Sequence, residues 1–229
     1  MNESPENEIL SCWEKNAEPW VTAVRDGQIE SRLAVTNRAI LDAIYLTQPK
    51  TVLDVGCGEG WLVRALDELG VNCLGVDGVG ALIEAARMAG GGRFETLSYE
   101  QVSDQRIHET FDLVVCNFSL LGDQSVSDLF KRVPSLLNEG GSLVVQTLHP
   151  NAVSGGEGYE SGWRAGSWAG FDDQFCDPAP WYFRTMAGWR ELFEGAGFQL
   201  TATVEPLNPG TQIPASVVFT AVFRGVDNH

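Results

Sequence analysis

Basic residues are few in this sequence. Lysine and arginine together number 15, against 31 aspartates and glutamates, and the formal net charge is −16. Such a surface repels the phosphates of nucleic acids and anionic membranes unless basic residues gather locally. The longest basic cluster is the pair Lys131 and Arg132, which is too short to override the net charge. The composition therefore predicts a protein without a nucleic-acid partner.

Cysteines and long apolar runs are also scarce. The five cysteines are scattered and odd in number, without C-x-x-C spacing, so we expect neither a disulfide framework nor a metal site. No apolar stretch approaches the length of a membrane span. Residues 1–15 lack the cationic start and apolar core of a secretory signal. We therefore expect a cytoplasmic protein without a membrane span, as a monomer or a homodimer.

What the sequence does contain is an alternation of short apolar runs with amphipathic stretches. Residues 1–30 predict one or two short helices, and residues 31–47 predict a helix with Ser31 as its N-cap. Strands are expected over 51–55, 72–77, 93–97, 111–117, 142–148, 198–206 and 215–224, with helices over 60–69, 80–89, 125–137 and 186–196. Short apolar strands separated by helices predict a parallel sheet covered on both faces. The link between the last two strands is too short for a crossover helix, so that pair should be antiparallel.

The segment VLDVGCGEGWLVRAL runs from an apolar strand through a glycine-rich turn into an amphipathic helix. Gly56, Gly58 and Gly60 would let a ligand lie against bare backbone where the helix begins. A dinucleotide site has the spacing G-x-G-x-x-G and seats a pyrophosphate, but here the third glycine comes one residue early. Two carboxylates, Asp54 and Glu59, would also oppose a phosphate. They favour a ligand that carries an ammonium and a sulfonium and no phosphate, which describes S-adenosylmethionine.

This segment resembles the first motif of the class I S-adenosylmethionine-dependent methyltransferases, and the similarity extends over roughly residues 50–148. In that family the acidic residue and the glycines contact the methionyl part of the cofactor. The resemblance therefore places Asp54, Gly56 and Gly58 at that part, and it implies that Gly60 allows close packing of the helix.

The resemblance implies further cofactor contacts along the same edge of the sheet. Asp77 ends the next strand, where the family's acidic residue binds both ribose hydroxyls, and a carboxylate can accept two hydrogen bonds from a diol. Many members have an aspartate beside the adenine, whereas this chain has Ser98 and Tyr99, and the tyrosine could instead serve packing. The remaining implied cofactor contacts are Cys57, Gly78, Cys116 and Asn117, of which the last two should approach the sulfonium.

The resemblance and the element order together predict one α/β domain. Its fold should be Rossmann-like and doubly wound, with a mostly parallel sheet of seven strands whose last strand is antiparallel. The expected parts are an N-terminal helical cap (1–47), a cofactor-binding core (50–148), a substrate lid rich in aromatic residues (149–185), and a C-terminal helix with the antiparallel strand pair (186–229).

Residues after the core predict the substrate side of the site. His149 stands where the cleft should open and is the expected general base, with a structurally bonded histidine as the alternative. The density of aromatic residues over 159–183 suits a cover for a flat, largely apolar substrate, although a loop that packs its own small core has the same composition. Arg164 and Arg184 could pair with a carboxylate of the substrate. Alternatively, they could form ion pairs with acidic neighbours such as Asp172 and Asp173. The expected substrate contacts are Trp20, Arg164, Trp168, Trp181 and Arg184.

The predicted activity is transfer of a methyl group from S-adenosylmethionine to a small, aromatic or apolar molecule. The N-terminal and C-terminal segments resemble, more loosely, the ubiquinone- and menaquinone-pathway methyltransferases. The sequence CNFS stands in place of the Pro-Pro-aromatic motif of enzymes that methylate nucleobases or protein amides. Aminopropyl transfer and a catalytically silent S-adenosylmethionine-binding protein are the open alternatives, and the acidic turn argues against a nicotinamide-dependent oxidoreductase.

Overall fold

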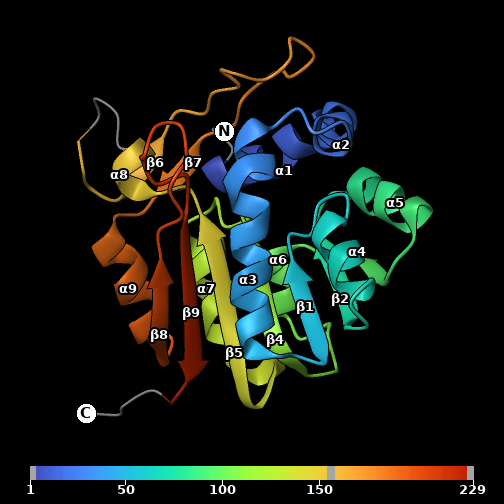
Figure 1. Ribbon diagram of the computed structural model, residues 1–229, viewed down its shortest axis with the longest axis vertical. Coiled ribbons are helices and arrows are strands. Elements are labelled where there is room, and N and C mark those ends of the chain that lie inside the picture. The colour runs from blue at the N-terminus through green and yellow to red at the C-terminus, as the bar shows by residue number, and fades with distance from the viewer. Residues whose placement is uncertain (1–3, 154–157, 226–229) are drawn as a thin grey trace.

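The computed structural model of the protein describes residues 4–153 and 158–225. Its centre is a seven-stranded sheet with the strand order β3-β2-β1-β4-β5-β9-β8 (Figure 1). Strand β9 is antiparallel to both of its neighbours, and the pairs from β3 to β5 are parallel. The predicted doubly wound sheet with an antiparallel last strand is confirmed. The strands are β1 (Thr51–Val55), β2 (Asn72–Asp77), β3 (Arg93–Thr96), β4 (Phe111–Asn117), β5 (Leu137–Thr147), β8 (Phe198–Val204) and β9 (Val217–Phe223).

Helices cover both faces of this sheet. Helices α3, α4 and α5 pack on one face, and α6, α7 and α9 pack on the other; α3 crosses the front of the sheet in Figure 1. No helix in the described part of the chain has both the length and the apolar character needed to cross a bilayer. The helices are α1 (Pro5–Lys15), α2 (Ala17–Arg25), α3 (Asn37–Thr47), α4 (Trp61–Asp67), α5 (Gly80–Ala89), α6 (Tyr99–Ser103), α7 (Gln124–Arg132), α8 (Pro150–Val153) and α9 (Met186–Gly195), with a π-helical turn η1 (Arg32–Thr36) and a 3₁₀ turn η2 (Val133–Leu136).

The central strands are apolar on both faces, which is why their sequences lack a polar alternation. In β1, Val52 packs in the cluster under α3 and Leu53 packs in the cluster under α7 and α9. Their register partners in β4, Leu113 and Val114, divide in the same way, and all four are fully buried. Burying such a side chain contributes about 1.5–3 kcal/mol, so this double cover holds the carboxyl ends of the strands in a fixed arrangement.

Three local predictions were wrong. Ser31 already has helical backbone angles and makes no cap hydrogen bond, because the chain enters α3 through the π-helical turn. The helix predicted over 125–137 ends at Arg132, since Pro134 cannot continue it and a 3₁₀ turn follows. The lid segment over 149–185, for which no strand was predicted, contains the short antiparallel pair β6 (Gly162–Arg164) and β7 (Trp181–Phe183).

Candidate functional site

A cavity of about 1270 Å³ lies at the carboxyl ends of the parallel strands, the edge where doubly wound sheets bind ligands. The turn after β1, the N-terminal helices and the segment around β6 and β7 all contribute to its wall. The predicted site residues that line it are Gly56, Cys57, Gly58, Asp77, Gly78, Ser98, Tyr99, Asn117, Trp20, Trp168, Trp181 and Arg184. The predicted site residues outside the lining are Asp54, Gly60, Cys116, His149 and Arg164.

The three glycines of the turn differ in what surrounds them, although all have positive φ angles (77°, 58° and 82°). A Cβ at Gly56 would lie 2.3 Å from the Cβ of Ser119, and one at Gly60 would lie 2.7 Å from the Phe94 ring. A Cβ at Gly58 would meet nothing closer than Trp20 Nε1 at 3.6 Å. Gly56 and Gly60 are therefore required for packing, whereas Gly58 leaves its space to the cavity.

The two carboxylates at this turn differ in their partners, because Glu59 is paired with arginines and Asp54 has an oxygen without a hydrogen bond. Glu59 is buried, and its carboxylate accepts hydrogen bonds from Arg25 Nε at 2.9 Å and Arg64 Nη2 at 2.7 Å. Asp54 is also buried, but its Oδ1 has no hydrogen-bond partner. Burial and the nearby Asp77 raise the pKa of Asp54 to about 8, against the opposing charge of Arg32. An unpaired buried carboxylate is costly unless a cation joins it.

Asp77 connects the turn after β1 to the turn after β2. Its Oδ2 accepts a hydrogen bond from the Gly58 N–H at 2.9 Å, and its Oδ1 accepts one from the Val79 N–H at 2.9 Å. Burial raises its pKa, while the two backbone donors act in the opposite direction. Each oxygen keeps a second lone pair, and the residue lines the cavity, so the carboxylate can accept further hydrogen bonds from a ligand there.

Arg32 is a residue of the site that the sequence-based reasoning missed. Its guanidinium lies 4.9 Å from the Trp61 ring centroid and 5.8 Å from that of Trp20, and it lines the cavity. Burial lowers its pKa to about 10, and the carboxylates of Glu59 and Asp54 oppose that shift. No local pattern singles Arg32 out, because its position is set by the π-helical turn before α3.

Ser98 and Tyr99 begin a helix, α6, that was not predicted. Ser98 caps it by accepting a hydrogen bond from the Gln101 N–H at 3.3 Å, and the Gln101 side chain reaches back to the Ser98 N–H at 2.9 Å. The Tyr99 hydroxyl donates to the Ser119 carbonyl at 2.7 Å, and burial raises its pKa. Both residues line the cavity and can therefore reach a bound ligand. Their contact with an adenine stays a prediction.

Three other predicted residues lie outside the cavity lining. His149 is buried, with its Nε2 at 3.5 Å from Glu205 Oε1 and its Nδ1 accepting from the Asn151 N–H at 3.3 Å. Cys116 packs in the cluster under α7 and α9. Arg164 donates to carbonyls of its own loop. The surroundings of His149 resemble the structurally bonded alternative, and the described hydrogen bonds of Arg164 go to backbone carbonyls. Their roles at the site stay predictions.

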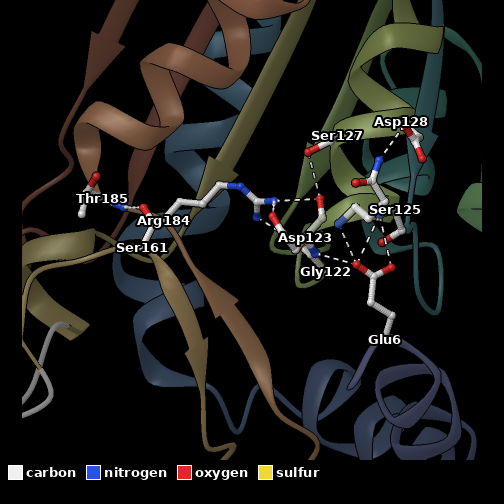
Figure 2. A network of polar contacts seen from close by, with 10 residues as sticks. Glu6, Gly122, Asp123, Ser125, Ser127, Asp128, Ser161, Arg184 and Thr185 are labelled. Atoms are coloured by element: carbon white, nitrogen blue, oxygen red, sulfur yellow. Dashed lines mark hydrogen bonds and ion pairs between the residues drawn. The ribbon is translucent and has the colours of Figure 1, made fainter. Parts of the chain in front are cut away.

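Arg184 lines the cavity, but its hydrogen bonds go to the start of α7. Its Nη1 donates to the Gly122 carbonyl at 2.8 Å, and its Nη2 donates to the carbonyl and the carboxylate of Asp123 at 3.0 and 3.3 Å (Figure 2). Its acidic neighbour is therefore Asp123 rather than Asp172 or Asp173. Burial also lowers its pKa. The arginine joins the segment after β7 to the loop between β4 and α7.

Glu6 caps α7 from the far end of the chain. Its carboxylate accepts hydrogen bonds from the backbone N–H groups of Asp123, Gln124 and Ser125 at 2.9, 2.7 and 3.2 Å (Figure 2), whereas the side chain of Asp123 makes no cap bond. A carboxylate at this end also interacts favourably with the helix dipole. One residue thus holds α1 against the loop that borders the cavity.

We expect Glu6→Ala to destabilise the fold by about 1 kcal/mol, the usual effect of losing a helix cap. For a chain of this length that corresponds to a fall in Tm of about 2–4 °C, measurable by thermal denaturation. Glu8→Ala is the matched control, because Glu8 is an exposed residue of the same helix. Equal Tm values for the two variants would contradict the capping role.

Aromatic side chains of the N-terminal helices meet those of the segment over 166–180. The Trp13 ring lies 4.9 Å from Trp20 and 5.7 Å from Trp168, and Trp168 lies 4.8 Å from Phe175. Asn16 joins the same two parts, because its Oδ1 accepts from the Cys176 N–H at 2.9 Å and its Nδ2 donates to the Cys176 carbonyl at 2.8 Å. The cavity therefore has a cover made from the N-terminal helices and the segment over 166–180.

Comparison with known proteins identifies the family. The model of the methyltransferase domain family matches residues 28–203. Ubiquinone biosynthesis O-methyltransferases of Bradyrhizobium diazoefficiens and Idiomarina loihiensis are 32% and 33% identical over 102 and 110 residues, which cover 44% and 46% of this chain and 40% and 45% of those proteins. The chain thus spans less than half the length of either relative.

Solved structures share the fold at lower identity. The DhpI–SAH complex has a TM-score of 0.67 and 16% identity over 100% of both chains, and the S-adenosylmethionine-dependent methyltransferase of Mesorhizobium loti has a TM-score of 0.59 and 21% identity over 79% of this chain and 96% of that one. These likenesses match the doubly wound sheet, and the family model spans the acidic glycine turn and the strands that frame the cavity. The chain belongs to the methyltransferase domain family, and with it to the class I S-adenosylmethionine-dependent methyltransferases.

Proposed function

We propose that the chain transfers the methyl group of S-adenosylmethionine to a small molecule. The observation that carries the proposal is the unpaired, buried oxygen of Asp54 behind the glycine turn. A carboxylate in that place is stabilised by a ligand with a positive charge and destabilised by a phosphate. Decarboxylated S-adenosylmethionine, used in aminopropyl transfer, also carries an amine. It lacks the carboxylate that the guanidinium of Arg32 is suited to bind, so the intact cofactor fits better.

The residues that line the cavity, together with Asp54 behind the glycine turn, would suit both ends of this cofactor. Asp54 would face the methionyl ammonium and Arg32 the methionyl carboxylate, which matches the two charges of an amino acid. Asp77 would accept hydrogen bonds from the ribose hydroxyls, and its Gly58 and Val79 contacts hold it in place for that task. The space beside Gly58 would let the ligand approach the backbone of the turn. Ser98 and Tyr99 stay the proposed neighbours of the adenine.

S-adenosylmethionine supplies an electrophilic methyl group on its sulfonium when it is bound. The chain has to hold the acceptor in line with that group and to keep water away, and good positioning alone can contribute about 7–11 kcal/mol. The described lining contains no histidine or lysine, and His149 lies beside Glu205 instead. The geometry therefore favours an acceptor that needs no nearby histidine base, and the role of His149 stays a prediction.

The segment over 149–185 is proposed to act as a lid on the acceptor. Its residues Trp168 and Trp181 line the cavity, and its contacts with the N-terminal helices through Asn16 and Cys176 would couple closure to the cap over 1–47. The many aromatic side chains suit an aromatic or apolar acceptor. The acidic composition argues against nucleic acid, and a cytoplasmic location and a monomer or homodimer remain predictions.

The activity is tested by following release of S-adenosylhomocysteine from S-adenosylmethionine across a library of small phenols, amines and carboxylic acids. The proposal expects turnover with at least one of these compounds, and turnover should vanish in Asp54→Ala. A protein that binds the cofactor but turns over none of the library would instead support the catalytically silent alternative. A product that carries an aminopropyl group, identified by mass spectrometry, would support the other alternative.

The raised pKa of Asp54 predicts that cofactor affinity depends on pH. The ligand ammonium binds the ionised carboxylate, and with a pKa of about 8 that form becomes rare as the pH falls. We expect the Kd for S-adenosylhomocysteine to rise about 50-fold from pH 8 to pH 6. Calorimetry on the wild type and on Asp54→Asn checks this, since the variant should bind weakly at every pH. A pH-independent Kd in the wild type would show that Asp54 does not titrate with binding.

The same carboxylate gives the stability of the ligand-free protein the opposite pH dependence. Cofactor affinity should rise with pH, whereas the free energy of unfolding should fall. The folded state binds a proton that the unfolded state has already released between about pH 4 and pH 8, so stability should fall as pH rises through that window. Urea denaturation of the wild type and Asp54→Asn at both ends of the window measures the difference.

A further inference from the structure

Beyond Asp54, a row of polar side chains continues along the same face of the sheet. Asn117 ends β4, and its Cα partner on the neighbouring strand β5 is Gln146. Both stand two residues after valines that pack under α3, Val115 and Val144, so both lie on that face, because side chains alternate along a strand. Ser216, just before β9, accepts a hydrogen bond from Gln146 Nε2 at 2.9 Å. Thr36, at the end of the π-helical turn, is buried at the edge of the cavity.

This polar row, Thr36, Asn117, Gln146 and Ser216, presents oxygen atoms without partners. Thr36 Oγ1, Asn117 Oδ1 and Gln146 Oε1 are buried and make no hydrogen bond. Thr36 and Gln146 are each at least 98% buried as residues. Buried polar atoms are nearly always hydrogen-bonded, since leaving one unpaired costs free energy. Thr36 and Asn117 line the cavity, and Gln146 stands beside Asn117 on the neighbouring strand. Unpaired oxygens in these places call for a hydrogen-bond donor from a ligand.

We propose that the polar row binds an amine or ammonium group of the methyl acceptor. This inference rests on the proposed function, because it takes Asp54 and Arg32 as the cofactor's contacts and leaves the row for the second substrate. Asn117, which the family resemblance places near the sulfonium, belongs to the row because the acceptor must also approach the sulfonium. Asn117 and Thr36 line the cavity, so a bound molecule can reach the row. An ammonium group offers three N–H donors to the three unpaired oxygens, whereas a carboxylate offers none.

The charges around the cavity favour the same group. The described lining contains two guanidinium groups, of Arg32 and Arg184, and the second already has Asp123 and two carbonyls as partners. A carboxylate or phosphate on the acceptor would therefore meet an excess of negative charge, and a cation would be attracted, also by the aromatic faces. The lining carboxylates are those of Glu6, Glu14, Glu30, Glu59, Asp77, Glu100 and Asp172. Glu59 is paired with Arg25 and Arg64, and Glu6 accepts from backbone N–H groups of α7, so the excess of negative charge comes from the other five.

Matched aromatic fragments test the proposal on the protein saturated with S-adenosylhomocysteine. The panel contains phenyl groups with one-, two- and three-carbon spacers that end in an amine, an alcohol or a carboxylate. Saturation-transfer NMR titrations measure their binding without any turnover. We expect at least one amine to bind ten times more tightly than its matched carboxylate. Equal or tighter binding of the carboxylates, or no binding by any of the amines, would overturn the proposal.

Gln146→Met assigns the binding to the row, because methionine keeps the length of the side chain and removes its polar atoms. The variant should lose amine affinity at least tenfold while its Kd for S-adenosylhomocysteine stays within twofold of the wild type. Gln199→Met, at an exposed position of β8, is the matched control and should change neither. Thr36→Val serves as a second variant if Gln146→Met does not fold.

Two outcomes of the variant experiment would separate the alternatives. Loss of S-adenosylhomocysteine affinity in Gln146→Met would assign the row to the cofactor, and unchanged amine affinity would reduce it to a structural feature. Either result overturns the proposal. Failure of the wild type to bind S-adenosylhomocysteine would instead refute the proposed function itself.

Discussion

Asp77→Ala is expected to raise the Kd for S-adenosylhomocysteine about 10- to 150-fold. Hydrogen bonds to a charged group contribute about 1.5–3 kcal/mol, and a tenfold change in Kd corresponds to 1.4 kcal/mol. The carboxylate would lose its ribose hydroxyls, and the N–H groups of Gly58 and Val79 would lose the acceptor that holds the two turns together. Isothermal titration calorimetry measures the change directly.

Asp67→Ala is the control for this prediction, since Asp67 is an exposed residue at the end of α4. It should bind the ligand like the wild type. Asp77→Asn keeps one acceptor oxygen and should fall between the two. An unchanged Kd in a folded Asp77→Ala variant would remove this residue from the site.

The second large effect comes from a pair of substitutions in the glycine turn. We expect Gly58→Val to abolish binding of S-adenosylhomocysteine and to leave a folded protein. The positive φ of 58° costs a side chain about 1–2 kcal/mol, but the Cβ has room in the ligand-free protein. That room is the space that the ligand would need.

Gly60→Val should mainly lower the stability of the fold, whereas Gly58→Val should mainly abolish ligand binding. Its Cβ would lie 2.7 Å from the Phe94 ring and 3.0 Å from Ala86 Cβ, so strain and overpacking together should destabilise the fold by about 2–5 kcal/mol. Urea denaturation and calorimetry on both variants separate the two roles. Tight ligand binding by folded Gly58→Val would mean that this turn is not the cofactor site.

The parallel half of the fold could be predicted from the sequence because its signals are local. Strands β1, β2 and β4 have the predicted bounds, since each is a short apolar run with turn residues or a helix on either side. Of the predicted acidic residues, Asp77 lines the cavity and Asp54 is buried behind the turn, and their contacts with the cofactor stay a prediction. Helix α6 has a local signal as well, the Ser-x-x-Gln capping box that starts at Ser98, which is sufficient to predict where it begins.

The contacts that complete the site could not be predicted, because they join residues far apart in the chain. Glu6 caps a helix 117 positions later, and Asn16 bonds Cys176 across 160 positions. The pairing of β6 with β7 depends on the three-dimensional course of the lid rather than on any periodicity. The position of Arg32 beside Asp54 and Glu59 follows from how η1 packs, which a single sequence does not encode in a recognisable pattern.

Comparing S-adenosylhomocysteine with NAD as ligands tests the central claim most directly. Calorimetric titration of the full chain with each measures whether the acidic glycine turn selects an amino-acid-bearing nucleoside over a pyrophosphate. We predict binding of S-adenosylhomocysteine that Gly58→Val abolishes, and no measurable binding of NAD. Binding of NAD together with no binding of S-adenosylhomocysteine would contradict the account.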